Sequence, residues 1–182
     1  HMLWVVGIGG FAISGLFLAY HMFAHVRQRI DRFLDPQGRD TFQVDTALQS
    51  FSEGGWFGKG PGEGTIKRIL PDSHTDFIFA VFSEEFGLIG NGVLLVLYLL
   101  LIGRGLIIAA NAPTLFSRLL AGALTLSIFT YVFVNMGMVS GILPVVGVPL
   151  PFMSYGGTAF VTLSLGVGTL MSIQRHRTLV QT

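Results

Sequence analysis

Four long apolar segments constrain the fold of this chain more than any other feature of its sequence. They are residues 3–23, 77–102, 119–139 and 157–173. Each is close to the roughly 20 residues that an α-helix needs to cross the hydrocarbon core of a bilayer. Charged residues make up only 12% of the chain, about half the share found in a typical soluble domain. The sequence therefore predicts an all-α fold, a polytopic membrane helical bundle that forms a single membrane domain over residues 1–182 in contact with membrane lipids.

The polar segment of residues 24–76 lies between the first two apolar segments and is long for a loop. Val26, Ile30 and Phe33 recur on one helical face, which predicts a short amphipathic helix on the membrane surface. A second short amphipathic helix is predicted within residues 41–51. Loops of this length usually serve a function, so this segment is a candidate location for functional residues.

Residues 54–65, GGWFGKGPGEGT, contain six glycines. The Walker A pattern requires Gly-Lys followed by Ser or Thr, but Lys59 is followed by Gly60. The dinucleotide fingerprint needs a preceding strand and a following helix, and neither is evident. No organic cofactor is therefore expected. Two interpretations remain: a loop whose backbone approaches a ligand, with Lys59, Lys67 and Arg68 to meet an anion, or a flexible connector.

Acidic residues cluster where the second apolar segment begins, in LPDSHTDFIFAVFSEEFG, residues 70–87. Asp72 follows a proline, which favours a capping role at a helix start. Asp76 lies at the boundary with water, beside His74. A carboxylate there can accept a proton from a substrate hydroxyl or hold a divalent cation, Mg²⁺ or Mn²⁺, against a phosphate. These two uses and a simple salt bridge remain open on the residues alone.

Glu84 and Glu85 lie within the second apolar segment, on different faces of the predicted helix. An acidic side chain in a membrane segment either has a function or pairs with an internal cation. A functional role and a structural ion pair both remain open for these glutamates.

The charge distribution leaves the orientation in the membrane undecided. Residues 24–76 hold seven of the eleven Lys and Arg residues, together with eight of the ten acids. The positive-inside rule applies to short loops, and this segment is too long for it. The net charge of +1 argues against a nucleic-acid partner.

Three motifs, in this order, resemble the SEDS proteins of bacterial cell-wall synthesis, the group of FtsW, RodA and SpoVE. They are GGWFGKGPGEGT (54–65), LPDSHTDFIFAVFSEEFGLIG (70–90) and NMGMVSGILPVVGVPLPFMSYGG (135–157). The resemblance implies a multi-pass glycosyltransferase of the bacterial inner membrane that polymerises lipid II into peptidoglycan strands beside a class B penicillin-binding protein. Such proteins have more than four spans, so it also implies that this chain is the C-terminal part of a larger protein. Whether this part is active alone is left open.

The resemblance also implies roles for individual residues. Asp76 would be the catalytic acidic residue, in an extracytoplasmic loop of residues 24–76, with the C-terminus in the cytoplasm. A pyrophosphate leaving group needs nearby cations, and the acceptor sugar hydroxyl needs a base. The predicted substrate-binding residues are Lys59, Lys67, Arg68, His74, Glu84, Glu85, Ser154, Tyr155 and Gly156.

Three further questions stay open at this level. The GPGEGT segment resembles the division branch (FtsW), whereas the longer NMGMVSGILPVVGVPLPFMSYGG segment resembles the elongation branch (RodA) and favours it. A lipid II transporter is one alternative function, because Glu84 and Glu85 suit proton coupling. A non-catalytic membrane partner that docks a penicillin-binding protein is the other.

Overall fold

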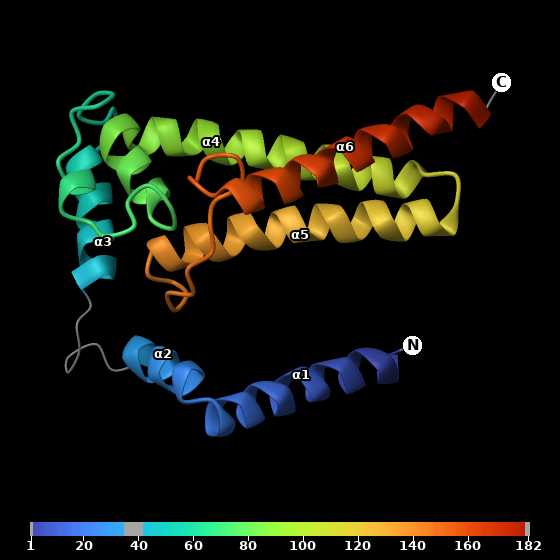
Figure 1. Cartoon of the computed structure of the whole chain (residues 1–182), viewed down its shortest axis with the longest axis horizontal. Coiled ribbons are helices and arrows are strands. Elements are labelled where there is room, and N and C mark those ends of the chain that lie inside the picture. The colour runs from blue at the N-terminus through green and yellow to red at the C-terminus, as the bar shows by residue number, and fades with distance from the viewer. Residues whose placement is uncertain (1, 35–41, 181–182) are drawn as a thin grey trace.

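A computed structural model of the chain describes residues 2–34 and 42–180, and the regular elements of this part are all helices (Figure 1). They are α1 (Met2–Met22), α2 (Ala24–Leu34), α3 (Phe42–Gly54), the short 3₁₀ helix η2 (Ile66–Arg68), α4 (Ile78–Asn111), α5 (Leu115–Val139) and α6 (Gly157–Val180). The predicted all-α class is confirmed, and so are the two short helices of the long polar segment. The two short helices are α2 and α3.

Three helices of the described residues are long and apolar enough to cross a membrane: α4, α5 and α6, the last over Gly157–Arg175. They lie side by side (Figure 1), and α4 and α5 run antiparallel because only three residues join them. The chain is therefore a polytopic membrane helical protein. The helix α1 has 21 residues, but several of its side chains lie outside the described residues, so a fourth span stays a prediction.

The observed helix bounds differ from the predicted ones where apolar content alone was a poor guide. Helix α4 continues nine residues past the predicted end at 102, because neither Gly103 nor Arg104 stops a helix. It ends at Asn111, two residues before Pro113, which cannot continue an α-helix. Helix α5 begins at Leu115, and the Thr114 hydroxyl caps it by accepting a hydrogen bond from the Ser117 backbone N–H at 3.1 Å.

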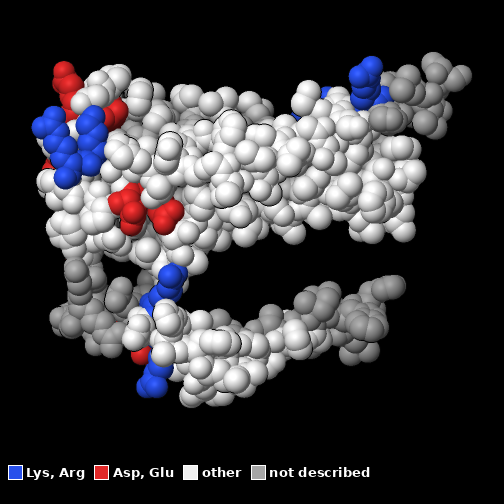
Figure 2. Space-filling view, in the orientation of Figure 1, with Lys and Arg blue, Asp and Glu red and all other residues white. Residues whose placement is uncertain are grey.

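Charged side chains gather at one end of the bundle, where residues 42–77 and 140–156 come together; we call these residues the cap. Figure 2 shows both signs of charge on the cap and a mostly uncharged surface along the middle of the bundle. The largest buried cluster lies where the cap meets the spans, and it includes Phe77, Met138 and Leu150. The cap is therefore packed onto the bundle through an apolar core.

Helix α4 is broken at Gly87, whose φ of 65° and ψ of −165° are not helical. The break frees the carbonyls of Glu84 and Glu85 and the N–H groups of Leu88 and Ile89. All four are paired with the glycine-rich loop of residues 54–65. Lys59 N and Gly60 N donate to the two carbonyls at 2.9 and 3.1 Å, and the N–H groups of Leu88 and Ile89 donate to Gly55 O and Trp56 O at 2.9 and 3.1 Å.

This pairing explains why the loop of residues 54–65 contains glycines, for which the sequence had left two interpretations open. A side chain at Gly58 would place its Cβ 2.1 Å from the Glu85 carbonyl oxygen, so only glycine allows the backbones to approach this closely. Backbone polar groups near lipid must be satisfied within the protein. At this position the loop approaches the backbone of α4, which neither interpretation had anticipated.

Candidate active site around Asp76

The three consecutive residues His74, Thr75 and Asp76 are held by their main-chain carbonyls. The Tyr155 backbone N–H donates to His74 O at 2.8 Å, and the Ser154 hydroxyl donates to Thr75 O at 2.6 Å. The Asn135 side-chain amide donates to Asp76 O at 2.8 Å. We call these contacts the carbonyl clamp. It leaves the side chains of His74 and Asp76 free for other contacts.

The segment that supplies the clamp is itself fixed. Ser154 Oγ accepts a hydrogen bond from Leu150 N at 2.6 Å, and the Tyr98 hydroxyl of α4 donates to Pro151 O at 2.6 Å. The predicted residues Ser154 and Tyr155 therefore contact the two residues before Asp76, Tyr155 through its main chain at His74 and Ser154 through its hydroxyl at Thr75. The side chain of Tyr155 is 82% exposed.

The carboxylate of Asp76 is half-buried, and it lies against the backbone of residue 147. A Cβ added at Gly147 would sit 3.0 Å from Asp76 Oδ2, so glycine leaves room for the carboxylate. Burial raises the pKa of Asp76 above its ordinary value, and the nearby charge of Asp72 adds to this effect. A higher pKa makes the carboxylate a stronger base, provided that the pH lies above that pKa.

The predicted capping role of Asp72 is wrong. Helix α4 begins at Ile78, its N-cap is Phe77, and no side chain caps it. Asp72 instead lies in a turn with a φ of 56°, where its carbonyl accepts hydrogen bonds from the N–H groups of Thr75 and Phe77. The residues after Pro71 form this turn before the helix begins, so the proline marks the turn and not the helix.

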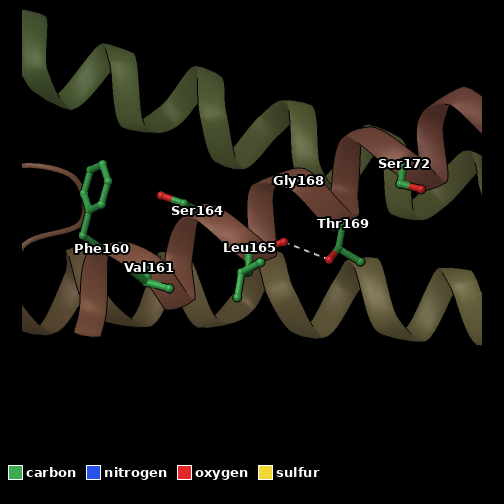
Figure 3. A pocket seen from close by; sticks show the side chains of 7 residues that line it. All are labelled: Phe160, Val161, Ser164, Leu165, Gly168, Thr169 and Ser172. Carbon is green, nitrogen blue, oxygen red and sulfur yellow. Dashed lines mark hydrogen bonds between the residues drawn. The ribbon is translucent and has the colours of Figure 1, made fainter. Parts of the chain in front are cut away.

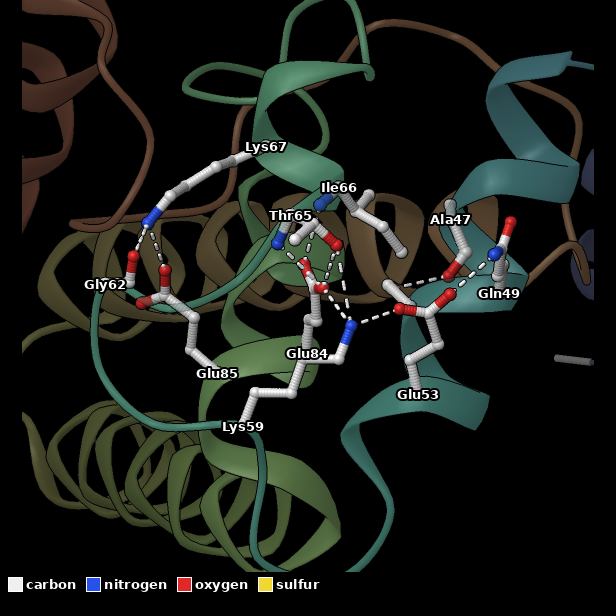
Figure 4. A network of polar contacts seen from close by, with 11 residues as sticks. Ala47, Gln49, Glu53, Lys59, Gly62, Thr65, Ile66, Lys67, Glu84 and Glu85 are labelled. Carbon is white, nitrogen blue, oxygen red and sulfur yellow. Dashed lines mark hydrogen bonds and ion pairs between the residues drawn. The ribbon is translucent and has the colours of Figure 1, made fainter.

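Glu84 is completely buried and is the centre of a polar network that joins α4 to the glycine-rich loop (Figure 4). Its carboxylate accepts hydrogen bonds from Lys59 Nζ at 2.8 Å, from Thr65 N at 2.8 Å, from Thr65 Oγ1 at 3.0 Å and from Ile66 N at 3.0 Å. This geometry agrees with the structural ion pair that the sequence left as one of two interpretations.

Two of the three predicted anion-binding cations are engaged with glutamates. Lys59 contacts Glu53 as well as Glu84, and these two partners raise the pKa of Lys59, while Lys59 lowers the pKa of Glu53. Lys67 Nζ lies 2.7 Å from Glu85 Oε1. The side chain of Arg68 is exposed and makes no hydrogen bond or ion pair within the described residues, although its backbone N–H donates to Thr65 O. Among the three, Arg68 is the cation with its donors available.

Replacing Glu84 by Gln should lower the free energy of unfolding by about 3 kcal/mol, because Lys59 loses a buried partner and an amide NH₂ would face backbone N–H groups. Thermal unfolding in detergent measures this. Glu63→Gln, at an exposed position in the same loop, should change stability by no more than about 0.5 kcal/mol. Equal melting temperatures for the two variants would show that the network does not stabilise the loop.

A metal site is not evident from the side chains. No group of three or more His, Asp or Glu residues lies close enough to hold a metal ion within residues 2–34 and 42–180. A divalent cation bound to Asp76 would have to be held largely by a substrate phosphate.

A groove of about 540 Å³ runs along α6 on the surface of the bundle (Figure 3). It is lined by Phe160, Val161, Ser164, Leu165, Gly168, Thr169 and Ser172. Its Phe160 ring packs edge-on against Phe152 of the cap, with 6.2 Å between centroids. The groove therefore starts at the cap and continues along the membrane-spanning part of α6.

The family that groups FtsW, RodA and SpoVE, described as "Cell cycle protein", matches residues 1–179. The chain belongs to the FtsW, RodA and SpoVE family. It is 52% identical over 161 residues to the "Peptidoglycan glycosyltransferase MrdB" of Escherichia coli K12, covering 86% of this chain and 44% of that protein. It is 38% identical over 174 residues to the "Probable peptidoglycan glycosyltransferase FtsW" of Caulobacter vibrioides, covering 96% and 45%.

Two solved structures are similar in fold to this chain. One, described as showing "structural coordination of polymerization and crosslinking by a peptidoglycan synthase complex", matches with a TM-score of 0.76 at 29% identity, covering 95% of this chain and 48% of that one. The rod shape determining protein RodA of Thermus thermophilus matches with a TM-score of 0.56 at 35% identity, covering 72% and 40%. The chain spans a little under half the length of the curated relatives named above.

Two residues of this family member were missed by the sequence analysis. Asn135 completes the carbonyl clamp, and Arg29 of α2 donates to Val145 O and Val146 O at 3.2 and 2.8 Å, beside Gly147. A signal existed for Asn135, because an amide inside an apolar span is rare and usually bonds across helices. Arg29 had no comparable signal, because its partners are main-chain carbonyls more than a hundred residues away.

Proposed function

We propose that the complete protein containing this chain is a peptidoglycan glycosyltransferase that polymerises lipid II, with Asp76 as the catalytic base. One observation carries the proposal. A half-buried carboxylate with a raised pKa is held by its main chain at the edge of the bundle, in a family with relatives named peptidoglycan glycosyltransferases. The same role of Asp76 was predicted from the motif that contains it.

In the proposed reaction the Asp76 carboxylate removes the proton from a sugar 4-hydroxyl of the acceptor. The hydroxyl oxygen then attacks the anomeric carbon of the donor from the face opposite the pyrophosphate. As the new C–O bond forms, the bond to the pyrophosphate oxygen breaks, and that oxygen keeps the electron pair. The configuration at the anomeric carbon is thereby inverted.

The pyrophosphate needs positive charge nearby. Arg68 is the best supported candidate, because Lys59 and Lys67 are paired with glutamates. Mg²⁺ or Mn²⁺ bridging Asp76 and the phosphates remains a further prediction. The groove along α6 offers an apolar surface, next to the cap, for the polyprenyl tail.

The proposal includes the orientation of the protein in the membrane and its partner protein. The cap, with the long polar segment, would face the extracytoplasmic side of the bacterial inner membrane, and the C-terminus would be cytoplasmic. A class B penicillin-binding protein would be the partner, which is supported by the similarity to a chain of a peptidoglycan synthase complex. The higher identity to MrdB, which is a RodA protein, than to FtsW supports the elongation branch.

The test uses the full-length protein with fluorescent lipid II in detergent, where no membrane separates substrate from enzyme. We expect glycan polymer on gels, because polymerisation needs no transport step. Lipid II transport in sealed vesicles without polymer in detergent would instead favour the transporter. Glu84 and Glu85, on which proton-coupled transport would depend, are both engaged in ion pairs.

The remaining alternative is a non-catalytic partner of a penicillin-binding protein. It predicts that substitution of Asp76 leaves all polymer synthesis by the complex unchanged. A complex in which the penicillin-binding protein's transpeptidase is blocked should still form polymer if the proposed function is correct.

A further inference from the structure

Asn135 is a buried polar residue in the middle of an apolar stretch of α5. Its side chain is 0% exposed, and both of its amide hydrogens are used: Nδ2 donates to Asp76 O at 2.8 Å and to Val148 O at 2.6 Å. Its Oδ1 atom is buried and has no hydrogen-bond partner within the described residues. An unpaired buried acceptor lowers stability, so this asparagine is a poor choice for packing alone.

The two carbonyls that Asn135 joins belong to different parts of the site. Asp76 O lies in the turn before α4, and Val148 O follows Gly147, the residue whose backbone lies against the Asp76 carboxylate. One side chain therefore sets the position of the catalytic turn relative to the backbone that covers its carboxylate. Ser154 and Tyr155 hold only the two preceding residues.

We propose that Asn135 is a positioning residue for Asp76: its amide fixes the turn at residue 76 against residues 147–148, and so fixes where the carboxylate meets the acceptor hydroxyl. This inference rests on the proposed function, because it needs Asp76 to act as a base. Asn135 itself has no access to substrate, since it is fully buried.

The charged groups around Asp76 allow a pH measurement to test this role. Asp72 lies in the same turn, His74 is two residues away, and Arg29 binds the carbonyls of residues 145 and 146. Residues 119–174 contain no Asp, Glu, Lys, Arg or His. Substituting Asn135 by a neutral residue therefore changes the placement of Asp76 without changing the charges near it.

The experiment compares Asn135→Ala with Thr125→Ala in the full-length protein. Thr125 is a matched control, because it is 1% exposed on the same helix and its hydroxyl donates only to Ala121 O, within α5. Both variants create a small cavity. We expect Asn135→Ala to lower kcat on the order of 100-fold with little change in KM, and Thr125→Ala to leave both nearly unchanged.

Two further readouts separate positioning from a general loss of stability. Without the Asn135 contact at Asp76 O, the carboxylate gains contact with water, so the acidic limb of the kcat profile of Asn135→Ala should shift to lower pH. Carbodiimide labelling of Asp76, followed by mass spectrometry, should also become faster. A structural role alone would lower the melting temperature and shift neither readout.

The outcomes that overturn the inference are distinct from those that overturn the proposed function. If Asp76→Asn stays fully active, the proposed function is wrong. If Asp76→Asn is inactive but Asn135→Ala has the wild-type kcat and pH profile, the positioning role is wrong. If Asn135→Ala loses the wild-type gel-filtration profile while Thr125→Ala keeps it, Asn135 serves the packing of the whole cap, and the inference also fails.

Discussion

Replacing Asp76 by Asn is expected to lower the rate of lipid II polymerisation on the order of 1000-fold in the full-length protein, because the amide cannot accept the hydroxyl proton. The side chain keeps its shape, and the carbonyl clamp acts on the main chain of residue 76, so the variant should fold. Gel separation of glycan products measures the rate. A variant with the wild-type rate would remove Asp76 from the chemistry.

The same variant should be more stable than the wild type at neutral pH. Burial and Asp72 raise the pKa of Asp76, so the folded state holds the proton more tightly than the unfolded state. Stability is therefore lost as the pH rises from the ordinary pKa of an aspartate through the raised one. We expect a higher melting temperature for Asp76→Asn at pH 7 and no difference at about pH 3, below the ordinary pKa.

The raised pKa of Asp76 also determines how the rate of the wild-type reaction depends on pH. The carboxylate must be ionised to act as a base, so the rate should fall as the pH decreases through the raised pKa of Asp76. The limb should lie above the pH at which an ordinary aspartate titrates. A rate that is flat down to about pH 4 would contradict the assignment of Asp76 as the base.

Replacing Gly87 by Ala is expected to prevent folding or to lower the free energy of unfolding by at least about 5 kcal/mol. Its backbone conformation is one that only glycine adopts readily, and an added Cβ would lie 2.4 Å from Gly58 N and 2.7 Å from Trp56 O. These neighbours are main-chain atoms, which cannot move aside without losing the hydrogen bonds that satisfy the break. Yield and gel-filtration profile in detergent provide the first measurement.

Gly92 is the matched control for Gly87. It lies five residues further along α4, and nothing is within 4 Å of its added Cβ. Gly92→Ala should leave stability unchanged or raise it by up to about 1 kcal/mol, because alanine favours a helix more than glycine does. If Gly87→Ala were as stable as Gly92→Ala, the break in α4 would not be a fixed feature of the fold.

Hydropathy over about 20 residues is a strong and local signal, and three of the four predicted spans correspond to helices long and apolar enough to cross a membrane. The sequence placed Asp76 at the boundary of a span, and residues 74–76 do precede α4 directly. It could not predict the partners of Lys59 or Glu84, since their contact joins residues 25 positions apart in the chain. Lys59, Lys67 and Arg68, which precede Asp76 in the sequence, suggested a binding site for an anion. In the structure Lys59 and Lys67 form ion pairs with Glu84 and Glu85, two residues that hydropathy had placed within a membrane span.

The roles of the loop glycines and of Asn135 could not be predicted from the sequence, for a related reason. A glycine in a loop can signal a ligand, a turn or a close approach of backbones, and only the position of α4 decides among them. Asn135 bonds to two carbonyls from two other segments, so its role exists only after both have folded against α5.

The carbonyl clamp has a consequence for how this site can change during evolution or by design. Because residues 74–76 are anchored through atoms that every amino acid carries, their side chains can be exchanged without dismantling the anchorage. The anchorage of this turn and its chemistry thus depend on different atoms, the main-chain carbonyls and the side chains. Histidine, glutamate or a non-natural base introduced at residue 76 would inherit the same main-chain anchorage, which makes this turn a suitable starting point for libraries that seek new transfer reactions.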